Sequence, residues 1–108
     1  MAKAGIDLVE VVRFKGLKPT DAFIVKVFSK YERDYCFART NAAEHLAGIY
    51  AAKEAGSKAL GVLKYPFIEL EVRHAKSGAP ELWHKNKRLN IAVSITHTKT
   101  MAAAVALG

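Results

Sequence analysis

The sequence predicts an α+β fold in which an antiparallel sheet packs on a long central helix. Three observations support this prediction. Helix signals fill the first sixty residues and include an alanine-rich segment at residues 42–60. Residues 67–107 instead hold short apolar or alternating runs separated by turn residues, which is typical of strands. Residues 4–9 form a further apolar stretch that we expect to return to this sheet as a strand.

The N-terminal strand carries one polar residue, Asp7, between the apolar residues Ile6 and Leu8. Burying a carboxylate without a partner costs several kcal/mol, so Asp7 must be hydrated, paired or bound to a metal ion. Asp7 also lies so close to the N-terminus that the apolar core of a signal peptide is not expected there.

Three short helices are expected before the long one. Their predicted boundaries are residues 9–17, 22–29 and 31–37. The second of these helices has Thr20 or Asp21 as its N-cap. The third follows a Ser-x-x-Glu capping box formed by Ser29 and Glu32.

The long helix is expected over residues 42–60, with Gly61 as its C-terminal stop. One side offers only methyl groups and lets another element approach closely; it holds Ala47, Ala51, Ala52 and Ala55. Glu54 and Lys58 stand four residues apart and project from another face. They form either an exposed ion pair worth roughly 0.2–0.5 kcal/mol, or a carboxylate and an ammonium that hold a metal ion and a phosphate.

The second part of the chain is expected to form one mostly antiparallel sheet. Its predicted strands are residues 67–74, 81–84, 91–95 and 101–107. Turn chemistry separates them at residues 76–80 and 85–90, and residues 96–100 join the last two strands. The final strand is apolar on both faces, so it needs cover on both sides.

Composition fits one domain spanning residues 1–108, because a chain of this length has room for a single core. The formal net charge of +7 favours an acidic partner, such as nucleic acid, an anionic membrane, a phosphorylated cofactor or an acidic protein. Cys36 is the only cysteine, which excludes an internal disulfide and a cysteine-rich metal cluster. No apolar run approaches the roughly 20 residues of a membrane helix, and a cytoplasmic protein is expected.

Asp7 and Glu54 are the two acids in the most constrained surroundings, and they can meet if the first strand packs on the long helix. Two such carboxylates repel unless they share a proton or a cation. A few oxygen ligands, completed by phosphate oxygens and water, suit Mg²⁺. Zinc is poorly supported because the four histidines show no recurrent spacing. A serine hydrolase is also disfavoured, because Ser94 and His97 lack a Gly-x-Ser-x-Gly motif.

Four motifs in order along the chain resemble the holo-[acyl-carrier-protein] synthases, which are small trimeric 4′-phosphopantetheinyl transferases. The motifs are G-I-D-L-V-E at residues 5–10, L-A-G-I-Y-A-A-K-E-A-G-S-K-A-L-G at residues 46–61, S-G-A-P-E-L at residues 77–82 and V-S-I-T-H-T at residues 93–98. They span nearly the whole chain, and the Lys-Glu-Ala-x-x-Lys core is the most specific part. Two positions depart from the family pattern: Ile49 replaces an arginine, and residues 61–63 replace a Gly-Thr-Gly turn.

The resemblance implies a phosphopantetheinyl transferase-like fold and an activity in fatty acid biosynthesis: transfer of 4′-phosphopantetheine from coenzyme A to a serine of apo-acyl carrier protein. It implies that Asp7 and Glu54 are Mg²⁺ ligands, that Lys58 contacts the pyrophosphate, and that Glu54 is the base. Residues of the last two motifs would enclose coenzyme A, partly across a subunit boundary of a homotrimer. These are Gly78, Pro80, Ser94, Thr96 and His97.

A basic surface is expected to face the acidic carrier protein, and its candidate residues are Arg13, Lys15 and Lys18. The competing hypothesis is a non-catalytic basic module that binds nucleic acid. That hypothesis accounts for the net charge of the chain but not for Asp7, Glu54 and Lys58. The transferase hypothesis, by contrast, predicts that neither nucleic acid nor a membrane is a partner.

Overall fold

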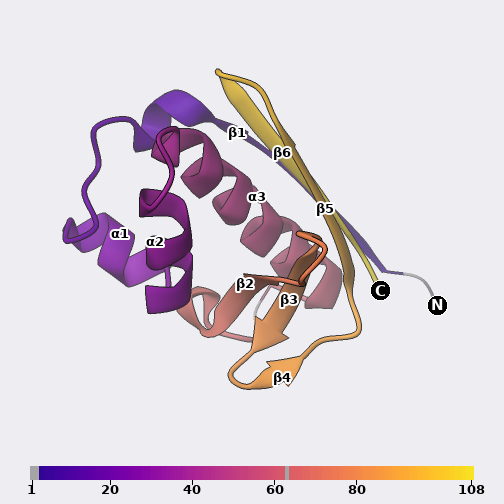
Figure 1. The fold of residues 1–108 in the computed structure, drawn as a ribbon. Coiled ribbons are helices and arrows are strands. Elements are labelled where there is room, and N and C mark those ends of the chain that lie inside the picture. The colour runs from indigo at the N-terminus through magenta and orange to yellow at the C-terminus, as the bar shows by residue number, and fades with distance from the viewer. Residues whose placement is uncertain (1–2, 63) are drawn as a thin grey trace.

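The long helix α3 (Ala42–Leu60) lies between a three-stranded sheet on one side and the short helices α1 (Ala22–Val27) and α2 (Lys30–Phe37) on the other (Figure 1). The computed structural model describes residues 3–62 and 64–108. The observed bounds of α3 are those expected from the sequence, and Gly61 follows with a φ of 102° that favours glycine. Leu63, in the segment that replaces the Gly-Thr-Gly turn, lies outside the described residues.

The first sheet has the strand order β1 (Ala4–Glu10), β6 (Met101–Leu107), β5 (Ala92–His97), and both pairings are antiparallel. The N-terminal strand therefore returns to the C-terminal part of the chain, as expected. Asp7 stands opposite Ala104, which is buried on the face of the sheet toward α3. The strand order places β1 and β5 at opposite edges of this sheet.

The second sheet consists of β2 (Leu70–His74), β3 (Pro80–His84) and the two-residue strand β4 (Lys87–Arg88). The expectation of one continuous sheet was therefore wrong, because the strands divide into two three-stranded antiparallel sheets. The hairpins of the second sheet close locally, and β3 packs on α3, where the Leu82 side chain fills the space beside Gly56.

The small residues of α3 let the first sheet approach closely. A Cβ added to Gly5 of β1 would lie 1.9 Å from the carbonyl oxygen of Ala55, and one added to Gly48 would lie 3.0 Å from the side chain of Ile95. Ala47, Ala51, Ala52 and Ala55 are all buried. The methyl face predicted from the sequence is confirmed, and it sets the distance between β1 and the polar residues of α3.

Several predicted boundaries of helices and strands were wrong, because tertiary packing overrides the local sequence pattern there. The first predicted helix, at residues 9–17, is only a 3₁₀ turn, η1 (Val11–Phe14), because Val9 and Glu10 pair with β6. The predicted strand at residues 67–74 begins with a 3₁₀ turn, η2 (Phe67–Glu69). The strand predicted at residues 91–95 runs to His97, which therefore belongs to β5 and not to the joining turn.

The helix caps on the other side of α3 follow the sequence in part. Ser29 and Glu32 form the predicted capping box at the start of α2. Asp21 precedes α1 without a side-chain cap bond, because its carboxylate accepts instead from the backbone N–H of Lys18 at 2.8 Å. Phe28 is extended, so α1 ends before residue 29.

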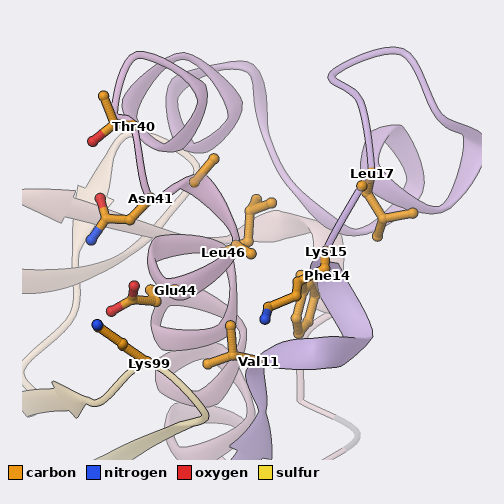
Figure 2. Close-up of a pocket in the computed structure, with 12 residues that line it drawn as sticks. Val11, Phe14, Lys15, Leu17, Thr40, Asn41, Glu44, Leu46 and Lys99 are labelled. Atoms are coloured by element: carbon orange, nitrogen blue, oxygen red, sulfur yellow. The ribbon is translucent and has the colours of Figure 1, made fainter.

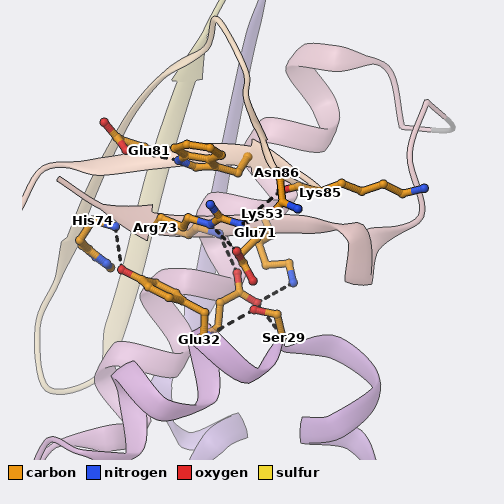
Figure 3. Close-up of polar contacts among 12 residues, drawn as sticks. Ser29, Glu32, Lys53, Glu71, Arg73, His74, Glu81, Lys85 and Asn86 are labelled. Carbon is orange, nitrogen blue, oxygen red and sulfur yellow. Dashed lines mark hydrogen bonds and ion pairs between the residues drawn. The ribbon is translucent and has the colours of Figure 1, made fainter.

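Besides capping α2, Glu32 forms a buried ion pair with Lys53. Its carboxylate accepts hydrogen bonds from Lys53 Nζ at 2.9 Å and from the backbone N–H of Val72 at 2.8 Å (Figure 3). Both charged side chains are 0% exposed, and Lys53 Nζ also donates to the carbonyl of Val27 at 2.6 Å. Burial raises the pKa of Glu32 and lowers that of Lys53, and each charge opposes the shift of the other. The pair ties α2, α3 and β2 together.

Cys36 is fully buried beside this ion pair, as expected for a lone cysteine. Burial, with a smaller contribution from the Glu32 charge, raises the pKa of its thiol to about 12. No helix among the described residues is long and apolar enough to cross a bilayer.

Candidate active site

Asp7 and Lys58 meet where β1 crosses the C-terminal half of α3. Lys58 Nζ donates to the backbone carbonyl of Ile6 at 2.8 Å and lies 3.5 Å from Asp7 Oδ1. The Asp7 side chain is 18% exposed and that of Lys58 is 47% exposed. The carboxylate in the apolar strand is thus paired, and both groups remain within reach of a ligand.

Glu54 projects from α3 one turn before Lys58, so the two side chains are neighbours on the helix surface. Among the described residues Glu54 makes no ion pair or side-chain hydrogen bond, and Lys58 turns to Asp7 instead. The alternative of a simple Glu54–Lys58 helix pair was therefore wrong. The observed polar pair is that of Asp7 and Lys58, from two elements that approach closely at Gly5, and Glu54 stands one helical turn before Lys58 on α3.

The residues expected to enclose coenzyme A separate into two groups. Gly78, Pro80 and His97 line one pocket of about 160 Å³ beside the N-terminal half of α3. Ser94 and Thr96 alternate with Ile95 on β5 and therefore lie on the outer face of the first sheet, opposite Val105 and Ala103 of β6. The sequence analysis assigned all five residues to one coenzyme A site. Within one chain, only Gly78, Pro80 and His97 line the same pocket.

The pocket and the Asp7–Lys58 pair lie at different ends of α3 and point in different directions around it. Ile49 lines the pocket, and Lys58 follows it by nine residues. At about 100° per residue, this spacing places the two side chains roughly 180° apart around the helix axis. His97 lies on β5 and Asp7 on β1, at the two edges of the first sheet. The two groups therefore lie apart within one chain.

The basic residues expected to face the carrier cluster around η1. Arg13, Lys15 and Lys18 are all exposed. Lys15 stands at the rim of a second pocket of about 430 Å³ at the N-terminus of α3, opposite Lys99 (Figure 2). The apolar part of its lining includes Val11, Phe14, Leu17 and Leu46.

Three aromatic residues in the smaller pocket were not predicted as site residues: Tyr35, His45 and His74. The Tyr35 ring stacks on that of His74 with centroids 3.9 Å apart, and His45 lies edge-on to His97 at 5.3 Å. No sequence signal indicated this cluster, because its members come from α2, α3, β2 and β5 without recurrent spacing.

The chain belongs to the 4′-phosphopantetheinyl transferase superfamily, whose sequence profile matches residues 3–107. It is also similar to individual enzymes named holo-[acyl-carrier-protein] synthase. The enzyme of Caldicellulosiruptor bescii is 40% identical over 113 aligned residues, which cover 95% of this chain and 93% of that protein. The enzyme of Chlorobaculum parvum is 36% identical, with 95% and 94% covered.

Solved structures give the same result for the fold. The holo-(acyl-carrier-protein) synthase of Bacillus anthracis, solved in complex with CoA (3′,5′-ADP), superimposes with a TM-score of 0.80 at 32% identity and covers 97% of this chain and 93% of that one. The synthase–CoA complex from Chronobacterium ammoniagenes has a TM-score of 0.78 at 31% identity, with coverage of 99% and 96%. The α+β fold predicted from the sequence is confirmed as that of this superfamily.

Proposed function

We propose that this protein is a cytoplasmic holo-[acyl-carrier-protein] synthase, which transfers 4′-phosphopantetheine from coenzyme A to a serine of apo-acyl carrier protein. The observation that carries the proposal is the meeting of Asp7 and Lys58, within 3.5 Å, one helical turn from Glu54. This arrangement occurs in a chain whose relatives are named for that activity. Charges of both signs at one place suit chemistry on a pyrophosphate.

In the transfer, the serine oxygen attacks the β-phosphorus of coenzyme A, and the bond from that phosphorus to the bridging oxygen breaks. Adenosine 3′,5′-bisphosphate leaves. Glu54 accepts the serine proton, directly or through a water molecule. Lys58 balances the negative charge that accumulates on the phosphate oxygens in the transition state.

The residues present fit Mg²⁺ bound together with substrate. No group of three or more acidic, histidine or cysteine ligands occurs among the described residues. Mg²⁺ commonly binds through one or two carboxylates, with substrate phosphates and water completing its shell. Asp7 and Glu54 would hold the ion, which would neutralise charge on the phosphates. Lys58 would then exchange its contact with Asp7 for one with the pyrophosphate.

The basic surface around η1 is our candidate for the carrier contact. Arg13, Lys15 and Lys18 complement an acidic partner and would steer it to the enzyme. A basic nucleic-acid-binding module remains the alternative from another class. It is not favoured, because it gives no role to Asp7, Glu54 and Lys58, and the chain belongs to a family of transferases.

A direct assay tests the proposed function. The purified protein is incubated with coenzyme A, Mg²⁺ and an apo-acyl carrier protein, and the carrier is then weighed by mass spectrometry. We expect a mass increase of one phosphopantetheine group and release of adenosine 3′,5′-bisphosphate. An unchanged carrier mass, with tight binding to duplex DNA or RNA, would favour the alternative.

Lys58→Ala should lower kcat by about 10²-fold while coenzyme A binding weakens much less. An ammonium beside a phosphate gains most of its interaction as charge builds in the transition state, so its loss appears in kcat as well as in kcat/KM. The control is Lys30→Ala, since Lys30 is an exposed lysine that also pairs with an aspartate, Asp34, at 2.7 Å. A change confined to KM would make Lys58 a binding residue only.

The proposed assembly is a homotrimer with coenzyme A bound between subunits. The outer face of the first sheet supports an assembly, because Ile6 and Leu8 are 69% and 66% exposed there. They stand beside Val105 and Ala103 of β6, and no other described element covers this face (Figure 1). The separation of His97 from Lys58 around α3 supports a shared site. The number three comes from the family resemblance.

Leu8→Glu should convert the trimer to monomers and abolish transfer, because a charge in the centre of an apolar interface opposes its burial. Light scattering reports the mass, and the carrier assay reports activity. The control is Val25→Glu, since Val25 is also an exposed apolar residue but lies on α1, on the far side of α3. A stable, fully active monomer would contradict both the trimer and the shared site.

A further inference from the structure

Lys53 holds the C-terminal end of α1 against α3. Its Nζ donates to the backbone carbonyl of Val27, the last residue of α1, at 2.6 Å. Its second partner is the carboxylate of Glu32 at 2.9 Å, which also accepts from the backbone N–H of Ser29 at 2.9 Å (Figure 3). The link between α1 and α2, residues 28–29, is therefore fixed on both sides by one buried ion pair.

Aromatic rings continue this contact from Lys53 to η1. Lys53 Nζ lies 4.9 Å from the centre of the Phe67 ring and 5.8 Å from that of the Phe28 ring. The Phe28 ring is edge-on to Phe14 of η1, with centroids 6.1 Å apart, and Phe14 lies 5.6 Å from Tyr50 of α3. Phe14 and Phe28 are fully buried. Protein interiors are close-packed and transmit strain, so the place of η1 depends on how the end of α1 is held.

Arg13 stands at the outer end of this aromatic cluster. Its guanidinium carbon lies 5.2 Å from the centre of the Tyr50 ring and 5.8 Å from that of the Phe14 ring, within the range in which an aromatic face attracts a cation. Arg13 and Lys15 flank Phe14 in the sequence and are exposed. Both belong to the basic surface proposed for the carrier contact, so packed side chains connect Lys53 to that surface.

The other end of this connection adjoins the candidate active site. Glu54 follows Lys53 directly on α3, and it is the proposed acceptor of the serine proton. The carrier protein must touch the basic surface and present its serine to Glu54 at the same time. Productive geometry of this kind needs supporting side chains that are themselves locked by packing and hydrogen bonds. A carrier that meets a displaced surface gives up contacts either there or at Glu54, which weakens productive binding.

We propose that Lys53 is a positioning residue for the carrier protein, because it fixes the basic surface around η1 relative to Glu54. The inference rests on the proposed function and extends it. The Lys53 side chain is 0% exposed, so it acts only through the residues packed on it. It lies five residues before Lys58, which places the two side chains about 140° apart around the helix axis. Coenzyme A binding at Lys58 therefore does not depend on the contacts of Lys53.

Steady-state kinetics of Lys53→Met with apo-acyl carrier protein and coenzyme A test the proposal. The folded fraction is measured by circular dichroism under assay conditions, and rates are expressed per folded molecule. We expect the KM for the carrier to rise by about tenfold, because the displaced surface weakens productive binding. The dissociation constant of coenzyme A, measured by isothermal titration calorimetry, should change by less than about twofold, because the groups that bind it keep their places.

Three further variants separate positioning from stability. Glu32→Gln/Lys53→Met should be more stable than Lys53→Met, since no buried charge lacks a counter-charge, yet it should keep the raised carrier KM, because the carbonyl of Val27 still lacks its donor. Leu82→Ala removes a buried side chain of β3 that packs on α3, and it should lower stability without changing the carrier KM. Lys30→Met removes the same charge from an exposed pair and should behave as the wild type.

The outcomes separate this inference from the proposed function. An unchanged carrier KM in folded Lys53→Met and in the double variant would make Lys53 a structural residue only and overturn the inference. An equal rise in Leu82→Ala, or a parallel weakening of coenzyme A binding, would overturn it as well, since either result reflects a general loss of order in α3. In each case a wild-type protein that modifies the carrier in the mass assay leaves the proposed function standing. A wild-type protein that modifies no carrier overturns the proposed function and the inference with it.

Discussion

Glu54→Ala and Asp7→Ala should each lower the rate of phosphopantetheine transfer by about 10²–10³-fold at saturating coenzyme A, while the protein stays folded. The size of the effect follows from the loss of a group that acts on developing charge in the transition state. The fold should survive because Glu54 makes no ion pair among the described residues, and Asp7 pairs only with a half-exposed lysine. The carrier mass assay measures the rate, and thermal unfolding monitors the fold.

A matched acid on the same strand provides the control. Glu10 is exposed and lies three residues beyond Asp7, on the opposite face of β1, so Glu10→Ala should leave transfer unchanged. Chelation with EDTA should abolish wild-type transfer, and added Mg²⁺ should restore it. Near wild-type turnover of either variant at limiting Mg²⁺ would show that Asp7 and Glu54 do not hold the metal ion.

The parts of the fold that could be predicted are those where the local pattern and the tertiary environment agree. The long helix and the final strand have the predicted bounds, Ala42–Leu60 and Met101–Leu107. Both are bordered by turn or cap residues, and the apolar residues on their inner faces are buried, including Ala102, Ala104 and Ala106 of β6. The segment Phe67–Glu69 alternates like a strand, yet it forms a 3₁₀ turn, because the pairing of β2 with β3 starts only at Leu70.

The site could be predicted to the extent that it depends on one helix and the strand packed on it. Asp7 stood out as an acid in an apolar strand, and the glycine and alanine residues of α3 bring that strand within reach of Lys58. The pocket histidines could not be found in this way. His45, His74 and His97 converge only because the hairpin of the second sheet folds back beside β5. The spacing of these residues in the sequence does not predict this tertiary contact.

The charged residues of the Lys-Glu-Ala-x-x-Lys motif have two different roles. Glu54 and Lys58 face the candidate site, whereas Lys53 points to the other side of α3 and is buried with Glu32 (Figure 3). Adjacent residues on a helix are about 100° apart, so one motif can supply both an active-site acid and a structural cation. Motif matching alone does not separate these two roles.

Lys53→Met should lower the free energy of unfolding by about 3–5 kcal/mol, because it leaves the Glu32 carboxylate buried without its counter-charge. The carbonyl of Val27 would also lose the donor that now lies 2.6 Å away. Urea unfolding measures the change. The control is Lys30→Met, which removes a lysine from the exposed Lys30–Asp34 pair and should cost less than about 1 kcal/mol.

The double variant Glu32→Gln/Lys53→Met distinguishes a lost charge pair from lost packing. Glutamine is uncharged, so no charge stays buried without a counter-charge, although its single amide oxygen can accept from only one of the backbone N–H groups of Ser29 and Val72, which now donate to Oε1 and Oε2 of Glu32 at 2.9 and 2.8 Å. We therefore expect the double variant to be more stable than Lys53→Met alone, by about 1–3 kcal/mol. The thiol of Cys36, inert in the folded protein because it is buried with a pKa near 12, should react with a thiol reagent fastest in Lys53→Met. If Lys53→Met lowered the free energy of unfolding by less than about 1 kcal/mol and Cys36 stayed unreactive, the ion pair would not be what holds α2 on α3.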